Sequence, residues 1–154
     1  MNKIELICVG HLKFKALKEL EQNYLKKINF FVSFSIRTLK DVKSSEDALK
    51  IKKEGEMIRE LLHKNDFVIA LDRQGKTLDS LEFSRFLDDK ISRHPGRLVF
   101  LVGGHAGLAD TLDSLIRFKL SFSKMTFAHD IFRILFLEQL YRAFTIQKGI
   151  TYHR

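Results

Sequence analysis

The C-terminal residues of the sequence combine three side chains that suit binding to an anionic or planar ligand. Tyr152, His153 and Arg154 supply an aromatic ring, an imidazole and a guanidinium. A chain end is normally the least ordered part of a domain, and this composition is unusual for a frayed tail. We therefore expect the tripeptide to contribute to ligand binding or to catalysis.

Three charged residues precede the tripeptide within a long and almost entirely apolar segment. They are Arg133, Glu138 and Arg142, in a helix predicted from residue 130 to about residue 147. On an exposed helix, Glu138 and Arg142 would form a stabilising i, i+4 pair worth roughly 0.2–0.5 kcal/mol. Ionic groups in an apolar surface need partners and often mark a site, so Arg142 is expected to reach a phosphate or carboxylate.

A glycine-rich segment is the second candidate for binding. Gly103-Gly104-His105-Ala106-Gly107 follows a predicted strand, and its glycines allow main-chain N–H groups to approach a ligand. The spacing differs from GxGxxG, so a dinucleotide-binding site is weakly supported. A tight structural turn remains the alternative.

Several other chemistries lack the residues that they require. The histidines do not have HxxxH spacing, and the sequence contains no pair of cysteines. No metal site is therefore expected. The sequence has no GxSxG motif and no P-loop lysine, which disfavours acyl transfer and ATP-dependent phosphoryl transfer. Cys8 is the single cysteine and is expected to pack as a small apolar side chain.

The composition is typical of one basic globular domain spanning residues 1–154. Apolar residues make up 45% of the 154 residues, which is enough for a substantial core. The net charge of +8 favours a polyanionic partner, although the scattered lysines also fit a protein that is merely basic. We expect a cytoplasmic protein without a membrane span, since no apolar run is long enough for a span or a signal peptide.

Hydrophobic patterning predicts alternating strands and helices. The expected strands are 4–9, 30–36, 67–71, 98–102 and 120–123, and the expected helices are 16–28, 45–62, 80–91, 111–117 and 130–147. Residues 72–76 are expected to form a polar turn, and Ser44 or Ser45 and then Asp130 are expected to cap the second and last helices. This order predicts an α/β fold with a mainly parallel sheet and helices on both faces.

Ligands of such sheets bind beyond the carboxyl ends of the strands. Leu71-Asp72, Gly103-Gly104 and the region of Ser123 all follow predicted strands, so one pocket is expected there.

The last helix is apolar around almost its whole circumference and must be buried on all sides. We favour packing of one face on the sheet and another on a second copy of the chain over full enclosure within one chain.

The motifs of the C-terminal half resemble a known family. They are Leu-Val-Gly-Gly-His-Ala-Gly at 101–107, Leu-Ser-Phe-Ser-Lys-Met-Thr-Phe-Ala-His at 120–129, and Glu-Gln-Leu-Tyr-Arg-Ala-Phe at 138–144 with the final Tyr-His-Arg. The sequence resembles the bacterial large-subunit ribosomal RNA methyltransferase H family, which comprises small, single-domain SPOUT methyltransferases. The resemblance runs the whole length and includes Val9-Gly10 and Lys53-Glu54-Gly55-Glu56.

This resemblance implies a homodimer of α/β subunits with a C-terminal trefoil knot, contrary to the usual absence of threaded chains. It also implies transfer of a methyl group from S-adenosylmethionine to N3 of a pseudouridine in the 23S rRNA of assembled ribosomes. The implied cofactor-binding residues are Leu71, Gly103, Gly104, Ser123, Lys124, Met125, Thr126, Phe127 and Ala128. The implied catalytic residues are Arg142, Tyr152, His153 and Arg154.

Two departures from the family pattern stand out. His105-Ala106 replaces a Pro-Glu pair that many members have after the two glycines, so an acidic side chain is missing there. Ala128 replaces a proline, which predicts a less rigid loop and weaker cofactor binding.

The proton on N3 must leave during the transfer. Because imidazole titrates near about pH 6.5, we predict that His153 is the base, with a water molecule as the alternative. Two other functions stay open: a basic RNA-binding assembly protein without catalysis, and an α/β enzyme that binds NAD or ATP.

Overall fold

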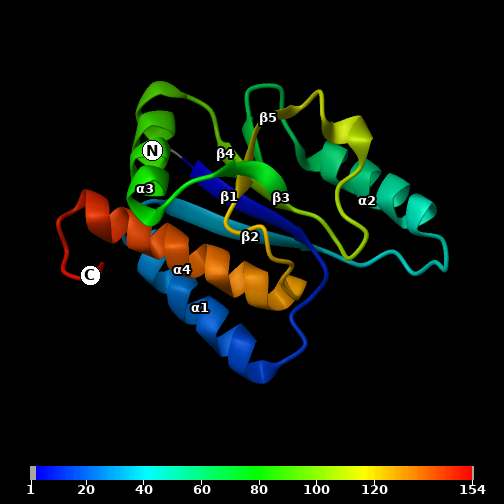
Figure 1. Ribbon diagram of the computed structural model, residues 1–154, viewed down its shortest axis with the longest axis horizontal. Coiled ribbons are helices and arrows are strands. Elements are labelled where there is room, and N and C mark those ends of the chain that lie inside the picture. The colour runs from blue at the N-terminus through cyan, green and yellow to red at the C-terminus, as the bar shows by residue number, and fades with distance from the viewer. Residues whose placement is uncertain (1–2, 154) are drawn as a thin grey trace.

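The computed structural model describes residues 3–153, which form five strands, four α-helices and one short 3₁₀ helix (Figure 1). In chain order the elements are β1 (Lys3–Val9), α1 (Lys15–Asn29), β2 (Ser33–Leu39), α2 (Asp47–Leu61), β3 (Phe67–Thr77), α3 (Ser80–Arg93), β4 (Leu98–Val102), η1 (Asp110–Leu112), β5 (Ile116–Ser121) and α4 (His129–Gln147).

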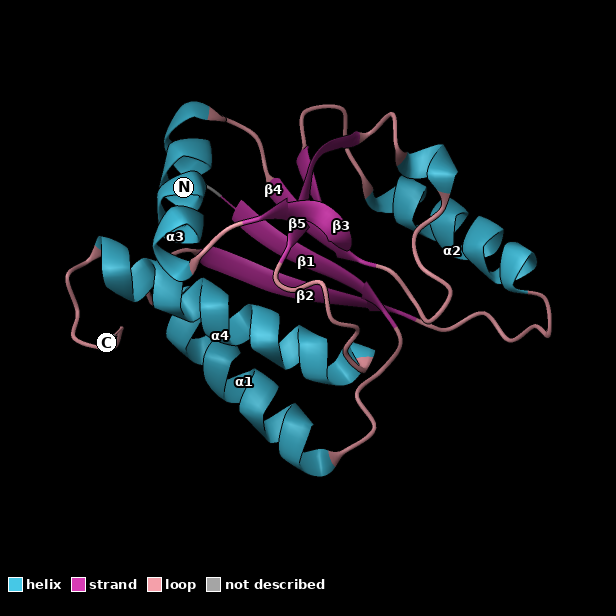
Figure 2. Ribbon diagram, viewed as in Figure 1, coloured by secondary structure: helices cyan, strands magenta, loops and turns pink. Residues whose placement is uncertain are grey.

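The five strands form one parallel sheet in the order β2-β1-β4-β3-β5. One face carries the larger apolar core, to which α1, α3 and α4 contribute, and the other face packs against α2 and η1 (Figure 2). β4 has all five residues buried, as expected for a central strand of a parallel sheet. The predicted α/β class with helices on both faces is confirmed, while the trefoil knot stays a prediction.

Three predicted element boundaries were wrong. The second strand begins at Ser33, because Phe30 still has helical backbone angles as the C-cap of α1. Residues 72–76 lie within β3, whose pairing with β5 shifts between Leu71 and Lys76, so the polar stretch is strand rather than turn. The predicted helix 111–117 is a 3₁₀ turn followed by β5, which ends at Ser121 rather than residue 123.

The predicted helix caps were also wrong. Glu46 and Ala128 occupy the N-cap positions of α2 and α4, and neither caps its helix through the side chain. Asp130 lies in the first turn of α4, where a carboxylate still interacts favourably with the helix dipole. Local sequence signals locate the first and last residues of a helix only to within one or two positions, because tertiary packing competes with them.

A buried ion pair joins α4 to α1. Arg133 is 4% exposed, and its guanidinium binds the carboxylate of Glu21 through Nε and Nη2, the latter 2.9 Å from Oε1. Arg133 Nη1 also donates to the carbonyl of Gly10 at 3.4 Å. Both charges are compensated, and removing one partner of such a pair typically costs about 3–5 kcal/mol. The pair therefore fixes α4 over the end of β1.

Only part of the circumference of α4 is covered within one chain. Phe136, Leu137 and Leu140 are fully buried against the sheet, whereas Ile131 is 50% exposed and Leu135 is partly exposed. Within residues 3–153, no helix is long and apolar enough to cross a bilayer.

Candidate functional site

The three strands whose ends were predicted to converge do lie next to one another, although β3 continues past Leu71 to Thr77. β4, β3 and β5 are neighbours in the sheet and run parallel, so their carboxyl ends open on the same edge. Leu71 lies beside Leu120 in the register of β3 and β5, and Gly103 directly follows β4. The structure therefore brings together Leu71, the glycine turn 103–107 and the loop 123–128 at one edge of the sheet.

The glycine turn has a clear steric reason for its composition. The amide of Gly107 donates to the carbonyl of Gly104 at 3.0 Å, and Gly107 has a φ of +92°, which favours glycine. A β-carbon on Gly103 would lie 2.8 Å from the backbone carbon of Gly107. The same β-carbon test finds open space beside Gly107. The turn is thus structurally required and also leaves room beside its main chain.

The loop 123–128 is held by short-range hydrogen bonds. The Ser121 hydroxyl donates to the carbonyl of Ser123, and the Met125 amide donates to the Ser123 hydroxyl, each at 3.0 Å. Arg73 Nη1 in β3 donates to the Thr126 hydroxyl at 3.3 Å. Met125 is 74% exposed, so the loop presents an apolar side chain to solvent. Of the other predicted cofactor-binding residues, Lys124, Phe127 and Ala128 are exposed.

Three of the four predicted catalytic side chains, those of Arg142, Tyr152 and His153, gather near the middle and C-terminal half of α4, close to the carboxylate of Glu138. Its Oε1 accepts hydrogen bonds from Arg142 Nε at 3.1 Å, Arg142 Nη2 at 2.6 Å and the Tyr152 hydroxyl at 3.1 Å. The guanidinium of Arg142 lies 4.7 Å from the centre of the Tyr152 ring. The predicted pairing of Glu138 with Arg142 is confirmed, and it is one part of a larger cluster.

Arg142 also contacts His153, with Nη1 3.2 Å from Nδ1. A guanidinium has no acceptor, so Nδ1 must accept this hydrogen bond and a neutral His153 then holds its proton on Nε2. His153 can take up a proton only after Arg142 has released Nδ1. Burial and hydrogen bonding with Tyr24 and Glu138 raise the pKa of Tyr152, so its hydroxyl stays protonated at neutral pH.

The two groups of predicted site residues do not meet within one chain. The loop 123–128 precedes α4, whereas the tail folds back on Glu138 and Arg142 in the middle and C-terminal half of the helix, about 14 and 20 Å along its axis from the first residue (Figure 1). Arg154 lies outside the described residues.

One acidic residue at the glycine turn was missed as a site residue. Glu54 of α2 is 5% exposed, and a β-carbon on Gly104 would lie 2.7 Å from its Oε2. Burial, with a further contribution from the nearby Asp41 carboxylate, raises the pKa of Glu54. A signal was present, since the helical spacing of Ile51 and Ile58 places Glu54 on the inward face of α2.

The raised pKa of Glu54 predicts that its charge opposes folding. A carboxyl whose folded-state pKa lies above its unfolded value contributes stability at low pH that is lost as the pH rises through the folded pKa. Glu54→Gln should therefore raise the free energy of unfolding by about 1 kcal/mol near neutral pH and by almost nothing at about pH 4. Urea unfolding at both pH values measures this difference. A variant that is destabilised equally at both would contradict the prediction.

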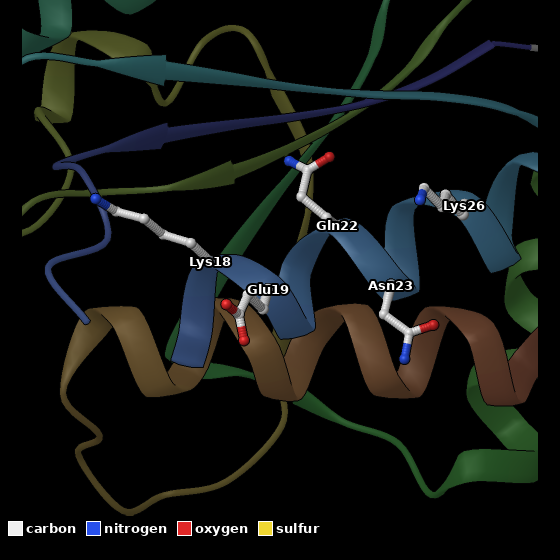
Figure 3. A pocket seen from close by; sticks show the side chains of 5 residues that line it. All are labelled: Lys18, Glu19, Gln22, Asn23 and Lys26. Carbon is white, nitrogen blue, oxygen red and sulfur yellow. The ribbon is translucent and has the colours of Figure 1, made fainter. Parts of the chain in front are cut away.

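A hollow lies on the exposed face of α1 (Figure 3). It is lined by Lys18, Glu19, Gln22, Asn23 and Lys26, whose side chains spread to both sides of the helix. None of the predicted site residues lines it. Within the described part of the chain, no group of three or more metal-ligating side chains is placed to hold a metal ion.

Comparison with known proteins identifies the family. A family model described as a predicted SPOUT methyltransferase matches residues 2–153. The ribosomal RNA large subunit methyltransferase H of Clostridium acetobutylicum is 41% identical, over 98% of this chain and 99% of that protein. The protein of the same name from Flavobacterium johnsoniae is 38% identical, over 97% and 98%.

A solved structure, the SpoU methyltransferase AviRb from Streptomyces viridochromogenes in complex with AdoMet, aligns with a TM-score of 0.44 at 11% identity, over 90% of this chain and 56% of that chain. That likeness is too distant to support an argument. The nearly full-length relatives confirm the resemblance seen in the sequence. The chain belongs to the SPOUT methyltransferases, within the ribosomal RNA large subunit methyltransferase H family.

Proposed function

We propose that residues 1–154 form a single SPOUT domain that methylates N3 of a pseudouridine in 23S rRNA of the assembled ribosome, as a cytoplasmic homodimer using S-adenosylmethionine. Family membership supports the reaction. The observation that carries the proposal is the alignment of Leu71, the glycine turn and the loop 123–128 along one sheet edge, where parallel sheets bind ligands.

The residues at that edge fit the proposed methyl donor. Open space lies beside Gly107, and the turn and loop offer main-chain N–H and C=O groups that can read the edge of an adenine. The exposed Met125 provides apolar surface for a planar ring, whereas the side chain of Leu71 is buried in the core. In this proposal Gly103, Gly104 and residues 123–128 hold the donor together with Leu71.

When bound, the donor supplies a methyl group on a positively charged sulfur, so the protein mainly has to position the reactants. Tyr152 would stack on the target base, and Arg142 would contact a phosphate of the RNA. The N3–H proton would pass to His153 once Arg142 has turned from Nδ1 to that phosphate. Arg154 would add a further positive charge beside the RNA.

A second copy of the chain would bring together the proposed donor-binding residues and the proposed catalytic residues, which lie apart within one chain. The loop 123–128 of one protomer can meet the tail of its partner if the partly exposed side of α4, with Ile131 and Leu135, forms a two-fold interface. Each active site would then combine the donor pocket of one protomer with the Arg142 cluster of the other.

The role of His153 is tested by His153→Ala. If His153 is the base, single-turnover methylation should fall by about 10²–10³-fold, and the pH profile of the remaining rate should differ from that of the wild type. If water takes the proton, the rate and its pH profile should stay unchanged, which would remove His153 from this role.

A non-catalytic RNA-binding function is the alternative that the net charge of +8 would also fit. Titration calorimetry with S-adenosylmethionine, followed by mapping of methylated pseudouridine in rRNA from cells with and without the gene, tests the proposal. Donor binding together with a methylation that disappears with the gene is expected. RNA binding without donor binding would support the alternative.

A further inference from the structure

Glu54 differs from the other buried glutamates of the described residues in lacking a cationic partner. Glu5 pairs with Arg37 and Arg97, and Glu21 pairs with Arg133. For Glu54, residues 3–153 provide no ion pair, and a single hydrogen bond reaches its carboxyl, from the Val42 amide to Oε1 at 3.3 Å. A buried carboxylate is costly unless it is paired, so this residue needs an explanation.

The packing of α2 places the carboxyl of Glu54 next to the glycine turn. Gly55, the next residue of α2, packs so closely that a β-carbon there would lie 2.6 Å from the β-carbon of Ala109. This approach brings α2 against the segment that follows the turn. On Gly104, a β-carbon would meet Oε2 of Glu54 at 2.7 Å and Cδ at 3.3 Å. The side chain that the turn faces on this side is therefore an acid.

Only one oxygen of this carboxyl has a hydrogen-bond partner among the described protein groups, and the other is not fully shut off from solvent. Oε1 is used by Val42, while Oε2 points toward Gly104 and has no hydrogen-bond donor among residues 3–153. Beyond the effect of burial, the neighbouring charge of Asp41 raises the pKa of Glu54, and the charge of Lys50 lowers it by less and forms no ion pair with it among the described residues. A carboxylate that is buried, half satisfied and aimed at a proposed binding turn is suited to a cationic group of a ligand.

We propose that Glu54 is the acidic group of the donor site, where its carboxylate pairs with a positively charged group in the amino-acid arm of S-adenosylmethionine. This inference rests on the proposed function. It assigns a donor-binding role to α2, an element outside the strand-end loops and the tail. It also explains why an acid occupies an inward position of α2.

The test is titration calorimetry of the full-length chain with S-adenosylmethionine and with 5′-methylthioadenosine, which keeps the adenosine and the sulfur but has no positive charge. Glu54→Gln should weaken S-adenosylmethionine binding by about tenfold or more, the usual effect of losing a charged hydrogen bond. Its binding to 5′-methylthioadenosine should stay within about twofold of wild type. Glu56→Gln, an exposed neutralisation on the same helix, should change neither affinity.

Glu54→Asp keeps the charge on a shorter side chain and should bind S-adenosylmethionine more tightly than Glu54→Gln. The inference is overturned if Glu54→Gln binds the donor like wild type, or if both Glu54 variants lose both ligands equally, which would indicate a structural role. If the wild-type chain binds neither ligand, the proposed function itself fails, and that result is distinct from either of these.

Discussion

Replacing Arg142 by alanine should lower single-turnover methylation of ribosomes by about 10²–10³-fold while S-adenosylmethionine binding stays unchanged. Arg142 is the group that holds the tail together, since it contacts Glu138, Tyr152 and His153. Its loss removes a cation from the proposed RNA site and releases the tail. Donor binding should be unaffected because the loop 123–128 precedes α4, about 20 Å along the helix axis from Arg142.

Arg142→Lys should recover only a small part of the lost rate, because an ammonium cannot reproduce the forked contact with Glu138 while also reaching His153. Lys148→Ala is the matched control, since it removes an exposed positive charge just beyond α4. It should retain nearly full activity at physiological salt. Equal losses in Arg142→Ala and Lys148→Ala would show that general charge, rather than the Arg142 cluster, determines the rate.

The proposal that two protomers share each active site makes a sharper prediction about mixed dimers. A heterodimer of Arg142→Ala and Gly104→Val protomers combines one intact donor turn with one intact tail from its partner. If sites form across the dimer, one of the two sites is restored, and the heterodimer should show about half of the wild-type activity. Affinity purification with two different tags isolates the heterodimer. An inactive heterodimer would place each site within one chain.

Gly104→Val is the second change with a large expected effect. The first added carbon would meet Glu54 Oε2 at 2.7 Å and Val9 Cγ1 at 3.2 Å, and the two further methyl groups would fill the turn. We expect S-adenosylmethionine affinity and methylation to fall by about 100-fold, because small displacements of a binding turn have effects of that size. Calorimetry of the purified variant measures the affinity.

Gly149→Asn provides the control for a general effect of replacing a glycine. Gly149 has a φ of +64°, a conformation that asparagine tolerates, and a β-carbon there would contact nothing within 4 Å. This variant should bind the donor like wild type. Wild-type affinity in Gly104→Val would exclude the glycine turn from the donor site.

The fold class was readable from the sequence because buried parallel strands have continuous apolar runs. The runs that became β1 and β4 were predicted to within a residue. The segment 72–76 was not, because its residues are polar and extend β3 only through pairing with β5, a partner distant in sequence. The start of β2 was misplaced because Phe30 and Val32 alternate like strand residues, yet residues 30–32 form the turn that ends α1, with the amides of Phe31 and Val32 donating to the carbonyl of Ile28.

The candidate site could be predicted where residue type alone reveals chemistry. Residue type singled out the glycine turn and the final aromatic and charged residues, the family resemblance added the loop 123–128, and the roles of all three stay predictions. Glu54 was not singled out, because an acid inside a helix normally faces solvent, and only the packing of Gly55 on Ala109 places it at the turn. The contact of Arg142 with Nδ1 of His153 was equally invisible, since it depends on how the tail folds back.

The sequence by itself determined the order of strands and helices, the family and the kinds of side chain available for catalysis, because these follow from local patterns and motifs. Only the tertiary structure decided which of those side chains meet. Strand order brings β4, β3 and β5 together at one edge, whereas the length of α4 separates that edge from the Arg142 cluster. The physical reason is that residue contacts depend on long-range strand pairing and helix packing, which local hydrophobic periodicity does not encode.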